Sequence, residues 1–207
     1  VLFVSHNMSA VASLCERTMV LKNGQMSFSG QTDVAITQYV EQGLINKEKT
    51  LEHLERRGNR KLTITHFRLE DAEGKPLQVA YSGQPVTLVF GFRNDELRQQ
   101  DRVSVGFSIK THLNEPLLIY YSDYSNVYYQ NLPPIGEFRC QLADFSLKPG
   151  AYMLGFRVVM NGSSATGKDV DYPSQAVPLK VVAGDYYGIG SADLPSVGYF
   201  LIRGQWS

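Results

Sequence analysis

The residues best suited to chemistry lie in one short segment, Tyr120 to Asn131, which combines aromatic rings with small polar side chains. Carbohydrate sites need flat rings beneath the apolar C–H faces of a sugar and planar polar groups for its hydroxyls, within a site that can stay wet. The segment has both kinds of side chain and therefore predicts a glycan site. Its candidate residues are Tyr120, Tyr121, Asp123, Tyr124, Asn126, Tyr128 and Tyr129.

The same composition also suits an edge strand and loop whose rings pack on the domain itself or on a second copy, because tyrosine is enriched at protein interfaces. Alternation along a strand sends neighbouring side chains to opposite faces, so some of the rings must point away from the core. The sequence leaves both interpretations open. A glycan site leaves rings on an open surface, whereas a dimerisation or docking module buries them against another chain.

The candidate site also includes two residues from later parts of the chain, Arg157 and Tyr172. Arg157 has the outward parity of its strand, where its guanidinium can bind vicinal hydroxyls or an acidic neighbour. Tyr172 follows Asp169 and Asp171 in what we expect to be a polar loop. Two carboxylates without further spaced oxygens fall short of a calcium loop, so we predict no metal.

Acid and base groups are present, but no catalytic pattern joins them. His66, His112 and the carboxylates of Asp123, Asp144 and Asp169 could in principle supply the pair that a glycosidase needs. The sequence has no nucleophile elbow and no zinc-ligand spacing. We therefore expect no catalysis in this chain, and a glycan-acting enzyme is the alternative.

A sheet must position these residues, because from about residue 62 apolar side chains recur at every second position. Glycine, proline and asparagine turns separate the alternating runs. This pattern predicts a mainly β domain over residues 62–207, an antiparallel β-sandwich of immunoglobulin-like or jelly-roll type. The predicted core faces are Val86, Leu88, Phe90 and Phe92; Val103, Val105, Phe107 and Ile109; Phe138, Cys140 and Leu142; Tyr152, Leu154, Phe156, Val158 and Met160; and Val177, Leu179 and Val181.

Two further features refine the predicted sandwich. The first run, Leu62 to Leu69, changes phase near Thr65 and His66, which predicts a β-bulge. The run at residues 197–202 is a terminal strand candidate that follows a glycine-rich stretch, so its exchange with a second copy would give a homodimer.

The first 43 residues have a different pattern. A four-residue apolar run, Val1 to Val4, ends at a turn that holds His6 and leads into a short helix. Asn23-Gly24 marks a hairpin, and Thr32 can begin a second helix. No G-x-x-x-x-G-K-[ST] phosphate loop occurs in the 207 residues, so ATP hydrolysis is not expected from this chain alone.

Residues 44–61 are rich in charge and poor in apolar side chains, which predicts an exposed helical linker. Its basic residues could contact nucleic acid or an anionic membrane, but glutamates lie between them and the formal net charge is zero. We therefore expect no nucleic-acid partner. Cys15 and Cys140 both lie on apolar faces, which predicts small buried side chains rather than a disulfide and favours an intracellular protein.

The N-terminal order of strand, histidine turn, helix and hairpin resembles the C-terminal part of ABC transporter ATPase domains, in which His6 would be the switch histidine that reaches the γ-phosphate of ATP. With the charged linker and the sandwich, the whole chain resembles the ATPase subunits of bacterial O-antigen polysaccharide exporters. In the sandwich the resemblance depends on Leu147-Lys148-Pro149-Gly150-Ala151-Tyr152, on the stretch from Gly184 to Gly190, and on Trp206.

This resemblance implies a carbohydrate-binding domain, dimeric, that recognises the non-reducing end of a lipid-linked O-antigen polysaccharide at the cytoplasmic face of the inner membrane. It implies a transmembrane exporter subunit as partner, and ATP with Mg²⁺ as cofactors of the full-length protein but none for residues 1–207. The mechanism it implies is mechanical, with linker residues 44–61 setting the reach of the sandwich. The sugar and its linkage do not follow from the resemblance.

Overall fold

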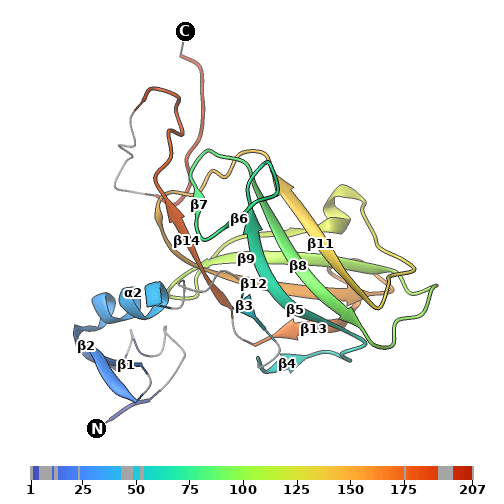
Figure 1. Ribbon diagram of the computed structural model, residues 1–207, viewed down its shortest axis with the longest axis horizontal. Helices are drawn as coiled ribbons and strands as arrows, with labels where there is room; N and C mark the ends of the chain where they lie inside the picture. The colour runs from blue at the N-terminus through green and yellow to red at the C-terminus, as the bar shows by residue number, and fades with distance from the viewer. Residues whose placement is uncertain are drawn as a thin grey trace.

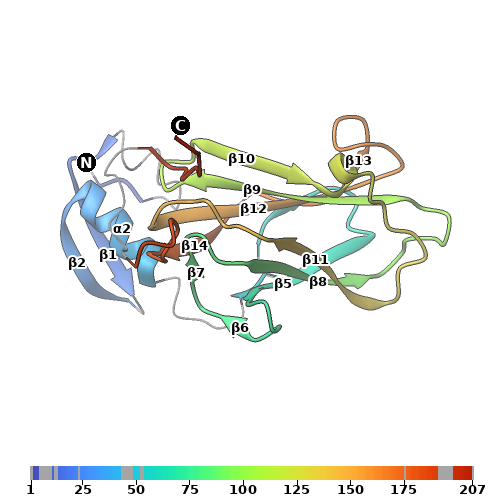
Figure 2. The same ribbon diagram turned by 90° about the horizontal axis from the view of Figure 1, so that it is seen from above.

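The computed structural model describes residues 2–4, 11, 14–22, 24–42, 49–51, 54–174, 176–190 and 198–206. Two antiparallel sheets pack face to face, and a small N-terminal unit lies at one end of them (Figures 1 and 2). The predicted β-sandwich is therefore confirmed. His6 lies outside the described residues, so its role stays a prediction.

The first sheet carries the strands that matter for the site. Its strand order is β10 (Pro116–Tyr121), β9 (Val103–Thr111), β12 (Gly150–Met160), β13 (Lys168–Pro173) and β4 (Arg56–Arg57). On the β13 side of β12, β14 (Val177–Val182) pairs with the first half of β12, and β7 (Ala80–Tyr81) pairs with β14 in parallel. A single turn of 3-10 helix, η1 (Ser122–Ser125), follows β10 directly.

The second sheet has the order β11 (Ile135–Leu142), β8 (Val86–Asn94), β5 (Leu62–Glu70) and β3 (Lys49–Thr50), with β6 (Pro76–Leu77) also on β5. The register of β5 against β8 shifts between Ile64 and His66, which confirms the predicted bulge. The core between the sheets is built from the predicted alternating faces, and Phe90, Phe107 and Phe156 in it are each less than a tenth exposed.

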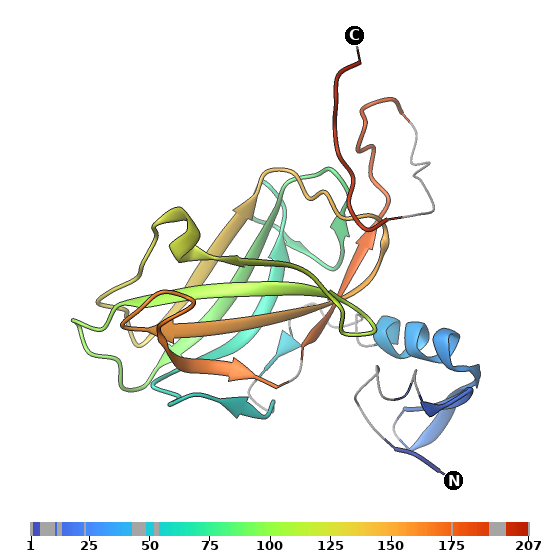
Figure 3. The ribbon, with the colours of Figure 1, turned by 180° about the vertical axis from the view of Figure 1, so that it is seen from behind.

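The N-terminal unit consists of the hairpin β1 (Arg17–Lys22) and β2 (Gln25–Gln31) followed by α2 (Thr32–Gln42). Gly24 has a φ of +78° at the predicted Asn-Gly turn, a conformation that glycine adopts without strain. Ile36 of α2 and Val11 form a small apolar cluster with Ala151 and Met153 of β12, so this unit covers the beginning of β12 (Figure 3). Its assignment to an ATPase domain remains a prediction.

The described part of the predicted helical linker is not helical. Its residues 49–50 and 56–57 are the strands β3 and β4, which pair with β5 and β13 of the sandwich. The charge pattern was a poor guide here because the side chain of Arg56 is buried between the sheets and meets Asp171, 115 positions away. Tertiary contacts of that kind override local propensity. The linker prediction was therefore wrong over these residues, which belong to the sandwich.

The C-terminal segment contacts the sandwich of its own chain through residues near Phe200, and its end then projects away from the sheets (Figure 1). Phe200 forms a β-bridge with Leu147, Leu201 is buried, and the hydroxyl of Tyr186 donates to the carbonyl of Leu201 at 2.9 Å. Strand exchange through residues 197–202 between two copies stays a prediction, with Val197 itself outside the described residues. Among the described helices, none is long and apolar enough to cross a membrane.

Candidate functional site

A row of outward-facing side chains crosses the first sheet from β10 to β13. Tyr121 of β10 and Arg157 of β12 are both register partners of Gly106 on β9. Val158 of β12 pairs with Asp171 of the next strand, β13, and this register places Tyr172 beside Arg157. The Arg157 guanidinium lies 5.9 Å from the centre of the Tyr172 ring. With Tyr124 of η1, whose ring centre is 5.7 Å from that of Tyr121, these residues form the outer-face cluster: Tyr121, Tyr124, Arg157 and Tyr172.

The ring of Tyr121 lies flat on the sheet because residue 106 has no side chain. A Cβ atom at Gly106 would stand 2.2 Å from Cδ1 of Tyr121, which is far inside van der Waals contact. A glycine within a strand often marks such a close approach. Burial raises the pKa of the Tyr121 hydroxyl, with a hydrogen bond from Arg157 acting in the opposite direction. The hydroxyl therefore stays protonated at neutral pH.

Arg157 is held at the centre of the cluster. Its Nε donates to Asp169 at 2.6 Å and one terminal nitrogen donates to the carbonyl of Ser164 at 3.0 Å. Burial disfavours its charge, but the hydrogen bonds with Tyr121 and Asp169 outweigh that cost and raise the pKa of the guanidinium. Its side chain is 28% exposed, so a fixed cationic fork remains accessible at the surface.

Asp123 fixes the loop that surrounds the cluster without facing a ligand itself. Its carboxylate accepts hydrogen bonds from Ser104 at 2.8 Å and from the backbone and hydroxyl of Ser164 at 2.9 and 3.0 Å. Burial opposes its ionisation, but these bonds outweigh burial and lower the pKa of Asp123. Tyr124, the next residue, is 61% exposed and is the most accessible ring of the cluster.

A bulge in β13 explains why Asp169 and Tyr172 face the same side although three positions separate them. The register of β12 against β13 shifts so that Val159 pairs with Asp169 and Val158 with Asp171. The extra residue, Val170, is fully buried in the core. The expected polar loop at 169–172 is therefore a strand, and Asp171 points inward as the buried partner of Arg56.

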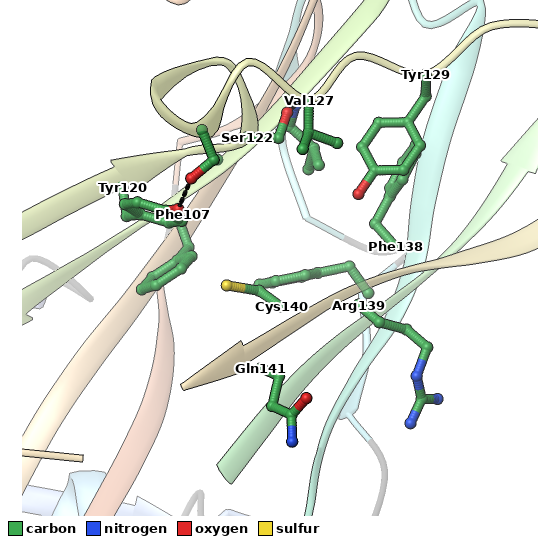
Figure 4. A pocket seen from close by; sticks show the side chains of 13 residues that line it. Phe107, Tyr120, Ser122, Val127, Tyr129, Phe138, Arg139, Cys140 and Gln141 are labelled. Carbon is green, nitrogen blue, oxygen red and sulfur yellow. Dashed lines mark hydrogen bonds between the residues drawn. The ribbon is translucent and has the colours of Figure 1, made fainter. Parts of the chain in front are cut away.

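The remaining predicted site residues do not join the cluster. Tyr120 and Tyr129 point inward and line a cavity of about 240 Å³ between the sheets, where Tyr120 hydrogen bonds to Ser125 and Cys140 points into the space (Figure 4). Tyr128 lies 3.4 Å beneath the guanidinium of Arg102. Asn126 caps η1 in the left-handed conformation at a φ of +57°, a structural role that asparagine fills well.

Gly106 and Ser164 also contribute to the site, although neither was predicted from the sequence. Gly106 has the outward parity of its strand, which was a usable signal, whereas Ser164 is recruited from a loop and left no pattern. No group of three potential metal ligands occurs among the residues that the structure describes. Asp169 and Asp171, considered above for calcium, bind arginines on opposite faces of the sheet.

Comparison with known proteins points to one family. The family model described as the Wzt C-terminal domain matches residues 53–194. The crystal structure of the C-terminal domain of wzt superposes with a TM-score of 0.59 at 16% identity, covering 76% of this chain and 90% of that one. A Niemann-Pick type C2 protein from the Japanese carpenter ant aligns at a TM-score of 0.39 and 7% identity, over 62% of this chain and 98% of that one. A search of curated proteins finds no match.

Proposed function

Because the chain belongs to the Wzt C-terminal domain family, we propose that its sandwich is a non-catalytic module that binds the non-reducing end of a lipid-linked O-antigen polysaccharide. The observation that carries this proposal is the outer-face cluster. Three tyrosines and an arginine converge on one open face of a rigid sheet, although they come from three separate parts of the chain.

The chemistry of the cluster suits a sugar ring. The Tyr124 and Tyr172 rings are exposed enough to lie under the apolar C–H face of a hexose, and Tyr121 and Arg157 offer hydroxyl and guanidinium donors to its oxygens. Since Gly106 and the hydrogen bonds of Asp123 fix these groups, ligand binding would order few side chains. The cluster would therefore read one or two sugar residues, as recognition of a chain end requires.

The carboxylates near the cluster support binding rather than hydrolysis. A glycosidase acid needs a carboxyl group whose pKa is raised so that it carries a proton at neutral pH. Asp123 has a lowered pKa and accepts three hydrogen bonds, and Asp169 is held by Arg157. Neither is placed to donate a proton, so the proposed module holds its glycan without cleaving it.

In the proposed exporter the sandwich acts beside an ATP-driven motor at the cytoplasmic face of the inner membrane. Glycan held by the outer-face cluster would be brought to a transmembrane subunit when the motor domains close on ATP. The N-terminal unit covers the beginning of β12, whose later residue Arg157 lies in the cluster, so one strand connects the two.

The first test is titration calorimetry of the 207-residue chain with polysaccharide from its own source and from an unrelated serotype. Tyr124→Ala should weaken binding of the matching polysaccharide about tenfold or more, because stacked aromatic contacts dominate such sites. Tyr128→Ala is the matched control, since Tyr128 is a tyrosine of the same segment that packs under Arg102 outside the cluster. Equal binding by wild type and Tyr124→Ala would contradict the proposed site, and no binding to either polysaccharide would contradict the function.

We also propose that two copies associate through the C-terminal segment. Three of its apolar side chains are exposed in the single chain: Ile202 is 79% exposed, Phe200 45%, and Trp206 is fully exposed. Contiguous exposed apolar groups of this kind mark interaction surfaces. Sedimentation of the wild-type chain should give a dimer, and Phe200→Ser with Ile202→Ser should shift it to the monomer. A wild-type monomer at high micromolar concentration would overturn this proposal.

A further inference from the structure

The outer-face row continues past Tyr172 onto β4, the edge strand that pairs with β13. Tyr172 is the register partner of Arg57, so the two side chains lie side by side at about 4.5–5.5 Å between Cβ atoms. Arg56, the preceding residue, points inward to Asp171, and alternation therefore turns Arg57 to the outer face. The full row is Tyr121, Gly106, Arg157, Tyr172 and Arg57.

The backbone position of Arg57 is fixed by the residues on either side of it. Arg56 donates to Asp171 at 2.5 Å and to the carbonyls of Leu51 and Ile64, and its side chain is 1% exposed. After Arg57, the amides of Asn59 and Arg60 donate to carbonyls of β13 at 3.2 and 2.8 Å. Gly58 allows this approach, because a Cβ there would stand 2.5 Å from the Val170 carbonyl oxygen.

The two arginines of the row differ in charge balance. Arg157 is neutralised by Asp169 at 2.6 Å. Arg57 is exposed, and none of the ion pairs within the described part of the chain involves it, although Glu55 lies two positions earlier on the same strand side. Within the described part of the chain, an exposed arginine without an ion-pair partner therefore lies on the strand next to Tyr172, at the end of a row that otherwise offers stacking surfaces and neutral donors.

We propose that Arg57 is a specificity-determining residue of the carbohydrate site and binds an oxyanion of the sugar, either a ring carboxylate or a phosphate substituent. This inference rests on the proposed glycan function and names the substrate class as an acidic carbohydrate. A guanidinium binds either oxyanion through two parallel N–H donors, and a sugar stacked on Tyr172 brings its substituent within reach of that fork. Because Arg57 lies on β4, the bound ligand also holds β4 against β13.

The experiment uses the 207-residue chain and four probes in ligand-observed NMR titrations: glucose, glucuronic acid, glucose 6-phosphate and inorganic phosphate. Wild type should bind at least one of the two acidic sugars about tenfold more tightly than glucose, the gain expected of one charge-assisted contact. Arg57→Gln should abolish that preference and leave glucose binding unchanged. Arg60→Gln is the matched control, because it removes a nearby exposed cation that lies beyond β4 and should keep the preference.

A second readout separates contact from general electrostatics. Hydrogen exchange of the Asn59 and Arg60 amides, which donate to β13, should slow when the acidic sugar binds wild type and should not respond in Arg57→Gln. Equal affinity of wild type for glucose and both acidic sugars would overturn the inference while leaving the glycan function intact. Inorganic phosphate binding as tightly as glucose 6-phosphate would also overturn it, by showing an anion site without sugar recognition. Failure of every sugar and of the source polysaccharide would instead refute the proposed function.

Discussion

Replacing Gly106 with alanine should disable the site, although it replaces none of the side chains proposed to contact the ligand, because it displaces the Tyr121 ring. The new Cβ would meet Cδ1, Cγ and Cε1 of Tyr121 at 2.2, 2.5 and 2.5 Å. Ordinary carbon contacts lie near 3.5–4.0 Å, so the ring must move by roughly 1.5 Å away from residue 106 and lose its fixed position in the cluster. Overpacking of this kind costs about 1–3 kcal/mol. At 2 kcal/mol the melting temperature of a chain of this size falls by about 4–8 °C.

The assay is a double-mutant cycle with thermal unfolding and polysaccharide titration as its two readouts. In the Tyr121→Ala background the clash has no partner, so Gly106→Ala should cost nothing and can stabilise by about 0.5–1 kcal/mol, the usual gain over glycine in a strand. The coupling energy between the two positions is therefore expected at about 1–3 kcal/mol. Gly155→Ala is the control, since its Cβ would meet only the movable Ser108 hydroxyl, at 2.9 Å. Additive effects of the two substitutions would refute the placement of the Tyr121 ring.

Three further predictions concern the sandwich outside the cluster. Asp171→Ala should destabilise the fold by about 3–5 kcal/mol in denaturant unfolding, because it leaves the buried Arg56 without its counterion, whereas pairing it with Arg56→Met should recover most of the loss. Burial disfavours the charge of Glu70, but hydrogen bonds from Arg139 and Arg68 outweigh burial and lower the pKa of Glu70. The ionised carboxylate therefore stabilises the fold above the unfolded pKa near 4.5, and this stabilisation is lost as the pH falls below that value. Thermal unfolding as a function of pH should show the loss, and Glu70→Gln should remove this pH dependence. Burial raises the pKa of the Cys140 thiol, so iodoacetamide should alkylate it at pH 7 much more slowly than a free thiol, and unfolding should accelerate the reaction. Equal alkylation rates for the folded chain and a free thiol would contradict the placement of Cys140 in the cavity.

The core could be predicted from the sequence because side-chain alternation is a local property. Every face predicted from two-residue periodicity, such as that of Phe90 and Phe92, points into the sandwich. The bulge near His66 was visible for the same reason, as a change of phase within one run. The parity of Arg157 also placed it correctly on the outer face.

The site was predicted only in part because strand register is not local. Alternation separates Tyr120 from Tyr121 but does not say which of the two lies on the outer face of the sheet beside Arg157. That depends on pairing of both strands with Gly106, across gaps of 15 and 51 positions, as the register pairs Tyr121 with Gly106 and Gly106 with Arg157. The strand β4 was missed since two residues carry no periodicity, and its pairing with β13 depends on a buried ion pair that charge counting treats as solvated.

The N-terminal unit also sets a limit on ligand size. Met153 and Arg157 lie on the same face of β12, four residues apart, which is about 13 Å along a strand. Met153 packs against the apolar cluster of Val11 and Ile36, so α2 covers the outer face of the sheet at that end of β12 and blocks it. A polymer lying across the outer-face cluster therefore cannot continue in that direction beyond a few sugar units. If the proposed glycan function holds, α2 would admit a chain end that stops short of it and would exclude the interior of a long chain along β12, which would give end selection a steric basis.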